Sequence, residues 1–168
     1  MASFSSQTKI EAARVAVKSA CCRRAELLAL TRFCGVIGIS RAGLNVTLGT
    51  SLEPVAQRIL SLIQKVYGFD CDIRRVEREQ LNRHARMQIS ITGQDAKRLL
   101  LDCGMLHADS QDALSFEEGI GYVPQRVCCR DAYLRGVFLA CGTIFPPQKR
   151  YHLEFLMDTS QMASELCD

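Results

Sequence analysis

The sequence predicts an α+β fold in which a unit of helix, two strands, helix, two strands and helix (αββαββα) occurs twice about a pseudo-two-fold axis, with the second copy truncated. Residues 21–37 read CCRRAELLALTRFCGVI, and residues 128–144 read CCRDAYLRGVFLACGTI. The offset of 107 residues is too long for a solenoid repeat, so it indicates two half-domains that face each other. Apolar residues also switch between helical and alternating periods in the same order in both copies. Eight of the seventeen paired positions are identical, namely Cys21/Cys128, Cys22/Cys129, Arg23/Arg130, Ala25/Ala132, Leu27/Leu134, Cys34/Cys141, Gly35/Gly142 and Ile37/Ile144.

The first two predicted elements are helices. Thr8 and Glu11 have the spacing of a capping box, which predicts a short helix that ends near Lys18. The second helix is expected over residues 23–34, where apolar side chains occur all round the helix and indicate burial on more than one side. Gly35 then provides a stop signal.

A hairpin and a third helix come next. Residues 36–39 and 44–48 predict two strands, with the turn at residues 41–43. We expect Ser51 to cap the following helix, because Pro54 then falls in the first turn, where its missing N–H costs little. The apolar stripe of this helix consists of Val55, Ile59, Leu62, Ile63 and Val66.

The first copy closes with two strands and a helix. Alternating apolar residues predict strands at 69–78 and 85–91, joined by a polar turn at 80–84. A helix is predicted over residues 94–103. Residues 107–127 contain glycines and a proline and are interpreted as a connector to the second copy.

The second copy is shorter than the first. It predicts a helix at 130–141, a strand, a Pro146-Pro147 turn, a strand at 151–157 and a helix from Thr159. We therefore expect a half-built second unit in a chain that is the truncated N-terminal portion of a longer protein. The predicted organisation is an N-terminal helix (1–20), a first half (21–106), a connector (107–127) and an incomplete second half (128–168).

Composition narrows the classes of function. With 168 residues, 48% hydrophobic and 23% charged, the chain can bury a sizeable core, and its net charge of +3 permits nucleic-acid contact without requiring it. Neither a membrane-length apolar run nor a signal peptide is present, so we expect a cytoplasmic protein. The nine cysteines are interpreted as free thiols. The pairs at 21–22 and 128–129 lack the C-x₂₋₄-C spacing of zinc knuckles, so packing is favoured over a structural zinc site and no cofactor is predicted.

The repeated helix carries a family signature. LLALTRFCG at 27–35 and LRGVFLACG at 134–142 resemble the two motifs of the LAGLIDADG homing endonucleases, whose fold has the same element order. The segments SFSSQTK, CCRRAEL, AYLRG and YHLEF further resemble the WhiA family of bacterial regulators of sporulation and cell division. This resemblance implies a non-catalytic, DNA-binding transcription regulator linked to cell division and chromosome segregation, and therefore a nucleoid-associated protein. The helix-turn-helix that the family places C-terminal to these units is not among the 168 residues.

The resemblance also assigns roles to the motif helices. In the endonucleases an acid before the closing glycine of each motif binds Mg²⁺, but this chain has Cys34 and Cys141 there, and a thiol is a poor ligand for a hard cation. We therefore predict that the chain is not an enzyme. These cysteines are expected to face each other near the axis, as packing groups rather than as a soft-metal or redox pair. The predicted interface of the motif helices comprises Ala29, Cys34, Gly35, Gly136, Cys141 and Gly142.

Basic residues on the strands are the candidate DNA contacts. In the resembled fold a saddle-shaped sheet lies on duplex DNA, so arginines on its outer face would contact phosphates. The competing interpretation is a solvated hairpin neutralised by Glu77 and Glu79. Because the strands carry few amides to read bases, we expect weak, salt-sensitive binding to duplex DNA from this portion alone. The candidates are Arg74, Arg75, Arg78, Arg83, Arg86, Lys149 and Arg150.

Two other functions stay open at this point. One is a protein-interaction or ligand-sensing scaffold with no DNA binding of its own, and the other is a residual nuclease, which the cysteines argue against. Other regulatory proteins are further expected partners, and a membrane is not. An exposed sheet edge would also permit self-association.

Overall fold

The computed structural model describes residues 3–41, 43–76, 86–108, 114–116, 124–148 and 151–167. The elements in chain order are α1 (Phe4–Arg14), α2 (Ala20–Cys34), β1 (Gly35–Ser40), β2 (Gly43–Thr50), α3 (Glu53–Tyr67), β3 (Ile73–Val76), β4 (Arg86–Thr92), α4 (Gly93–Asp102), β5 (Leu106–Ala108), β6 (Leu114–Phe116), α5 (Val127–Cys141), β7 (Gly142–Phe145), β8 (His152–Phe155) and α6 (Ser160–Cys167). Helices and antiparallel strands follow one another in the predicted order. The predicted α+β class is therefore confirmed.

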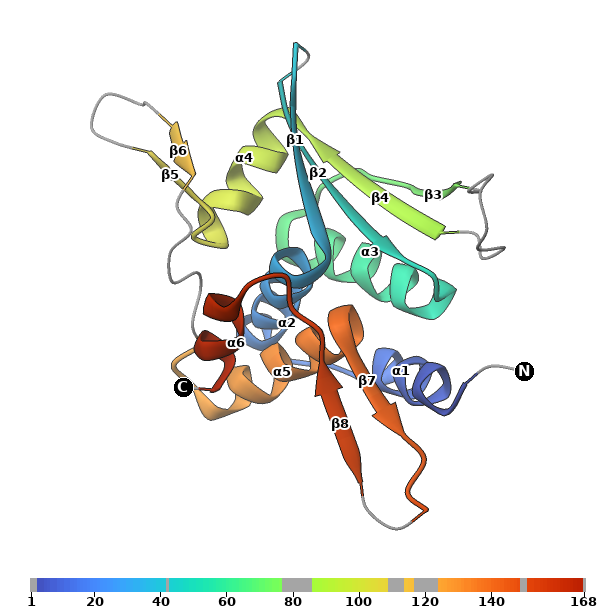
Figure 1. Ribbon diagram of the computed structural model, residues 1–168. Coiled ribbons are helices and arrows are strands. Elements are labelled where there is room, and N and C mark those ends of the chain that lie inside the picture. Colours follow the sequence, from blue (N-terminus) through green and yellow to red (C-terminus); the bar gives the residue numbers. More distant parts are fainter. Residues whose placement is uncertain are drawn as a thin grey trace.

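The first copy is a four-stranded antiparallel sheet with helices on one face. The strand order is β1-β2-β4-β3, so the hairpin β1–β2 is extended by β4 and closed by the short β3. Helices α2, α3 and α4 cover one face of this sheet, and none of the described helices covers the other face (Figure 1).

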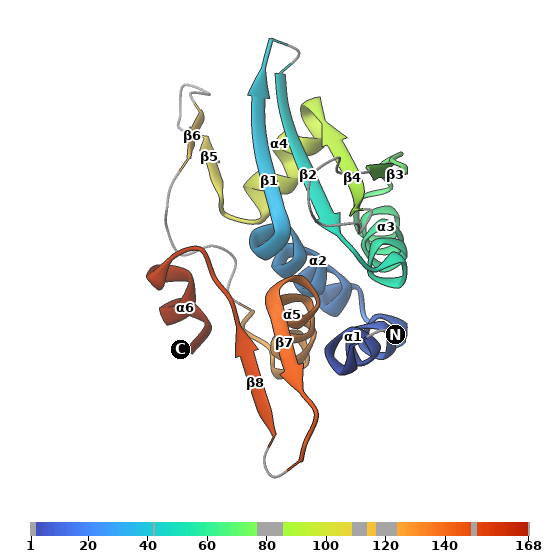
Figure 2. The same cartoon turned by 45° about the vertical axis from the view of Figure 1, so that its right-hand side comes forward.

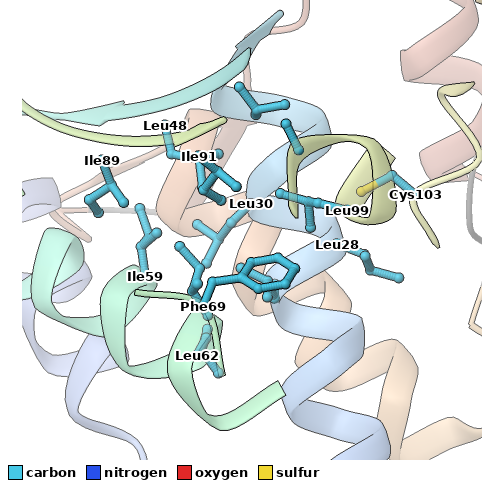
Figure 3. Packing of buried hydrophobic residues seen from close by; sticks show 14 of the residues in the cluster. Leu28, Leu30, Leu48, Ile59, Leu62, Phe69, Ile89, Ile91, Leu99 and Cys103 are labelled. Carbon is cyan, nitrogen blue, oxygen red and sulfur yellow. The ribbon is translucent and has the colours of Figure 1, made fainter. Parts of the chain in front are cut away.

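The core lies between the sheet and these helices (Figure 3). In β2 and β4 every second side chain is apolar, which turns one row inward, as expected from the two-residue period of a strand. Full burial of each such side chain contributes about 1.5–3 kcal/mol. The inward set from strands and helices includes Leu28, Leu30, Leu48, Ile59, Leu62, Ile89, Ile91 and Leu99, all at most 3% exposed.

The second copy contributes α5, which lies beside α2 at the centre of the molecule (Figures 1 and 2). Its hairpin β7–β8 points away from the first sheet and forms a separate two-stranded sheet. Helix α1 lies against this hairpin, where the backbone N–H of Ile144 donates to Oγ of Ser5 at 3.3 Å. No helix within the described part of the chain combines the length and apolar character needed to cross a membrane.

Several predicted boundaries were wrong for identifiable reasons. The first helix begins at Phe4 and not at a Thr8–Glu11 capping box, because Oγ of Ser3 accepts the N–H of Ser6 at 3.1 Å and caps it earlier. The helix also ends at Arg14, four residues before the predicted end.

The cap of α3 also differs from the prediction. Leu52, not Ser51, holds the N-cap position and makes no side-chain cap hydrogen bond, while Oγ1 of Thr50 accepts the N–H of Leu52 at 3.2 Å. The predicted first-turn position of Pro54 is confirmed.

Two segments between elements were also misjudged. The strand predicted at 69–78 begins only at Ile73, because Phe69 is buried and stacks on Tyr67 with ring centroids 4.7 Å apart. Residues 77 and 78 of that prediction lie outside the described residues. The segment interpreted as a plain connector contains the hairpin β5–β6. The turn predicted at 80–84 lies outside the described residues.

Candidate nucleic-acid interface

The helix-free face of the four-stranded sheet is lined with small polar side chains. The strand register places Arg74 beside Gln88, Thr47 beside Ser90 and Asn45 beside Thr92, all on the side opposite the core. Hydroxyl groups of Thr47 and Ser90 lie 3.3 Å apart. This face therefore offers hydroxyl and amide groups in the middle and arginines toward β3, and it has more hydrogen-bonding groups than the sequence suggested.

Arg86 lies across Gly49 on this face. A Cβ added to Gly49 would lie 2.6 Å from Nε of Arg86, so the missing side chain leaves the room that the guanidinium occupies. Nη2 of Arg86 is 3.5 Å from the carbonyl oxygen of Gly49. The guanidinium is thus held near the sheet surface and directed toward the middle of the sheet, away from the β3 edge.

The other predicted basic contacts are placed differently. Arg75 pairs with Met87 in the register and so shares the core side of the sheet, although it is exposed. Arg78, Arg83, Lys149 and Arg150 lie outside the described residues. Among the predicted candidates in the described ranges, the outer face therefore carries Arg74 and Arg86.

A lysine of α1, Lys9, lies near the C-terminal ends of the two motif helices, and the sequence analysis did not single it out. Burial lowers the pKa of Lys9, and the charges that Cys141 and Cys34 could carry act in the opposite direction, so the amine lies near both helix ends. The Nζ atom also lies 5.8 Å from the ring centroid of Phe138. The sequence placed Lys9 only on a short predicted helix and gave no signal for its partners.

The thiols of Cys34 and Cys141 form hydrogen bonds with backbone carbonyls of their own helices. Sγ of Cys34 donates to the carbonyl of Leu30 at 3.0 Å, and Sγ of Cys141 donates to the carbonyl of Val137 at 3.4 Å. Burial raises the pKa of Cys34 to about 12 and also raises the pKa of Cys141. Both groups are therefore protonated thiols at neutral pH, which suits packing better than metal binding.

The motif helices α2 and α5 meet at small residues. A Cβ added to Gly136 would lie 2.6 Å from the carbonyl oxygen of Glu26 and 2.8 Å from Cβ of Ala29. Because the 107-residue offset pairs Ala29 with Gly136, the pseudo-axis passes between them. At the helix ends, Gly35 and Gly142 lead directly into strands, and a Cβ on either would collide with Thr31 or Phe138 of its own helix.

Glu26 is a buried acid at this interface. It accepts two hydrogen bonds from Arg58 of α3, each 2.8 Å, and two from Arg135 of α5, at 3.2 and 2.9 Å. The Glu26 side chain is 0% exposed. This triad fastens α2, α3 and α5 together, and the sequence offered only the signal of a lone acid within an apolar helix.

The structure also brings cysteines together at the opposite end of these helices. Among the described residues, a single group could hold a metal ion through three or more side chains: Cys21, Cys22, Cys128 and Cys129.

Comparison with known families decides where the chain belongs. Residues 20–106 match a family described as the WhiA N-terminal LAGLIDADG-like domain, and residues 130–168 match the WhiA LAGLIDADG-like domain. The chain belongs to the WhiA family. The resemblance inferred from the sequence segments is thereby confirmed.

Relatives agree with this assignment, and solved structures share the fold. Proteins named "Probable cell division protein WhiA" are 36% identical over 99% of this chain, in Alkaliphilus oremlandii (53% of that protein) and in Heliobacterium modesticaldum (52%). The chain thus spans about half the length of these relatives. The crystal structure of the N-terminal LAGLIDADG domain of WhiA matches with a TM-score of 0.64 and 17% identity, over 98% of this chain and 71% of that one. Full-length WhiA from Thermatoga maritima matches with a TM-score of 0.65 and 16% identity, over 98% and 48%.

Proposed function

We propose that this chain is a non-catalytic, DNA-contacting part of a WhiA-type transcription regulator that acts in cell division, chromosome segregation and sporulation. The proposal rests on the outer sheet face, where Arg74 and Arg86 flank hydroxyl and amide groups. Lys9 adds a cation at the helix ends, where the endonucleases have acids. Phosphate contacts of this kind position a protein on a duplex without specifying a sequence.

The test is a fluorescence-anisotropy titration of the chain against duplex DNA at two salt concentrations. With phosphate contacts from Lys9, Arg74 and Arg86, an increase in salt from about 50 to 200 mM should weaken binding about 40-fold. Each neutralised phosphate contributes about 0.9 to the magnitude of the slope of log K against log salt. Binding that does not change with salt would contradict the proposal.

Two double variants, each of which removes two positive charges, show which face of the sheet binds DNA. Arg74→Gln/Arg86→Gln should weaken binding and reduce the salt slope by about 2. Lys65→Gln/Lys97→Gln removes the same charge from α3 and α4, on the opposite side of the sheet, and should bind like the parent. Equal losses in both variants would show that net charge alone is responsible.

Metal-dependent cleavage of DNA is not expected. Cys34 and Cys141 are protonated and bonded to their own helices, so the Mg²⁺ ligand pair is missing. Asp158 is the acid whose charge acts on Cys141. Nicking of supercoiled plasmid with Mg²⁺ or Mn²⁺ that copurifies with the chain and disappears in Asp158→Asn would overturn this part of the proposal.

A second candidate is a scaffold that associates with other copies of the chain. Exposed apolar side chains on and beside the β7–β8 hairpin favour it: Phe145 (45%), Tyr151 (82%), Leu153 (49%) and Leu156 (84%). Sedimentation over a range of concentrations separates the two candidates. Self-association that is lost in Leu153→Ser, in a chain that shows no salt-sensitive DNA binding, would favour the scaffold.

A further inference from the structure

The two adjacent cysteine pairs of the repeat meet in space. Cys21 and Cys22 lie in the first turn of α2, and Cys128 and Cys129 lie in the first turn of α5. All four Sγ atoms lie within 4.8 Å of one another, and those of Cys21 and Cys22 are 4.0 Å apart. The cluster is at the opposite end of the motif helices from Cys34 and Cys141.

The surroundings enclose this cluster on one side. Cys22 and Cys129 are buried at 8% and 3% exposure and pack with Ala25 and Ala132 at the pseudo-axis. Cys21 is half-buried and Cys128 is exposed, so an ion can enter from the Cys128 side. The site is therefore closed by protein on the side of Cys22 and Cys129 and open to solvent on the side of Cys128, and all four sulfurs can bind a single ion.

The spacing fits one tetrahedral metal ion. A Zn–S bond of about 2.3 Å gives an edge of about 3.8 Å between sulfurs in a tetrahedron. Sulfurs that already lie within 4.8 Å need to close by about 1 Å at most, which small changes of side-chain torsion supply. A disulfide would need one pair at about 2.05 Å and would leave two thiols without a role.

The electrostatic environment acts on these thiols in both directions. Both helix N-termini direct their positive ends at the cluster, which stabilises negative charge. Hydrogen bonds, with the strongest effect from Cys129 and a smaller one from Arg126, lower the pKa of Cys21. Burial raises the pKa of Cys22 and raises the pKa of Cys129 to about 12, so a bound ion has to displace the protons of these two thiols. Four thiolates and one divalent ion carry a net charge of −2, which the helix ends and this arginine partly offset.

We propose that Cys21, Cys22, Cys128 and Cys129 bind one Zn²⁺ ion that joins the N-terminal ends of α2 and α5. Binding of Zn²⁺ to four thiols releases up to four protons and changes no oxidation state. The C-x₂₋₄-C rule fails to detect this site because each half of the repeat supplies two adjacent ligands, and the pseudo-two-fold axis brings them together. The ion would act as a structural link between the halves of the molecule.

The experiment uses the purified, fully reduced 168-residue chain, stripped of metal and titrated with Co²⁺ under anaerobic conditions. Tetrahedral thiolate coordination should give intense visible d–d bands and an ultraviolet thiolate-to-cobalt band that saturate at one ion per chain. Addition of Zn²⁺ should bleach these bands, and Zn²⁺ should raise the melting temperature. Saturation below a tenth of an ion per chain, with all nine thiols still reactive after unfolding, would overturn the proposal.

Two double variants remove the same number of thiols from different places. Cys21→Ser/Cys128→Ser alters the less buried ligands and should weaken Co²⁺ binding at least about a hundredfold. Cys34→Ser/Cys141→Ser alters the repeat-related pair at the other helix ends and should bind like the parent. Circular dichroism verifies that both remain folded, and Cys22→Ala/Cys129→Ala provides a second test if the first variant unfolds. Equal binding by the variants and the parent would refute the site, as would loss of four thiols to air oxidation in a chain that takes up no metal.

Discussion

Removal of the Glu26 carboxylate should be among the most damaging single changes in this chain. Glu26→Ala leaves the guanidinium groups of Arg58 and Arg135, only 13% and 19% exposed, without their shared anion. Loss of one partner from a buried ion pair typically costs about 3–5 kcal/mol. At about 2–4 °C per kcal/mol for a chain of this length, the melting temperature should fall by about 6–20 °C.

The assay is urea unfolding followed by circular dichroism, with Arg24→Ala as the control. Arg24 pairs with Asp102 at 3.1 Å, but their side chains are 47% and 31% exposed, so this change should cost about 0–1 kcal/mol. Replacement of the whole triad, as Glu26→Leu/Arg58→Met/Arg135→Met, should be more stable than Glu26→Ala, because no buried charge is left without a partner. A cost for Glu26→Ala no larger than that of Arg24→Ala would refute the reasoning.

Other predictions concern packing and pH. Gly136→Ala should destabilise the chain by about 1–3 kcal/mol in urea unfolding, and Ala29→Gly in the same chain should restore only part of this, because the contact with the Glu26 carbonyl persists. Burial raises the pKa of Cys34 and of Cys103 to about 12 from 9.0. Between about pH 9 and pH 12, both thiols therefore stay protonated in the folded chain, whereas the same two thiols lose their protons in the unfolded chain. Their stabilisation is fully present below about pH 9 and declines toward pH 12, by about 1.4 kcal/mol per pH unit for each thiol. In urea unfolding at a series of pH values across this range, the free energy of unfolding should fall less steeply with pH for Cys34→Ala/Cys103→Ala than for the parent. An equal fall in the two proteins would count against the burial argument.

Local patterns were enough to predict most helices and strands. The motif helices, the β1–β2 hairpin and the inward row of β4 follow from periodicities that depend on a few neighbouring residues. The strand predicted from residue 69 failed because alternation alone cannot show that the Phe69 ring packs on Tyr67 instead of continuing a ladder. Gly136 lies close to Ala29 and the Glu26 carbonyl, and its small size and place in the motif were the sequence signals at this position.

Features assembled from distant segments could not be predicted in the same way. The partners of Glu26 lie 32 and 109 residues away, on different helices, and no short motif links them. The cysteine cluster was dismissed on the spacing within one pair, although the repeat itself pairs Cys21 with Cys128 and Cys22 with Cys129. Residues related by the repeat and lying on the helix face that carries Ala29 are brought together by the axis.

The contact between α2 and α5 is symmetric in backbone but not in chemistry. The 107-residue offset places Leu28 at the position of Arg135, and Ala29 at the position of Gly136. A second α2 in the place of α5 would therefore give Glu26 one arginine fewer and would bring a methyl group to a point where there is no room for one. The first half of one molecule thus discriminates against another first half and in favour of a second half. The differences between the two helices therefore disfavour pairing of two first halves through α2.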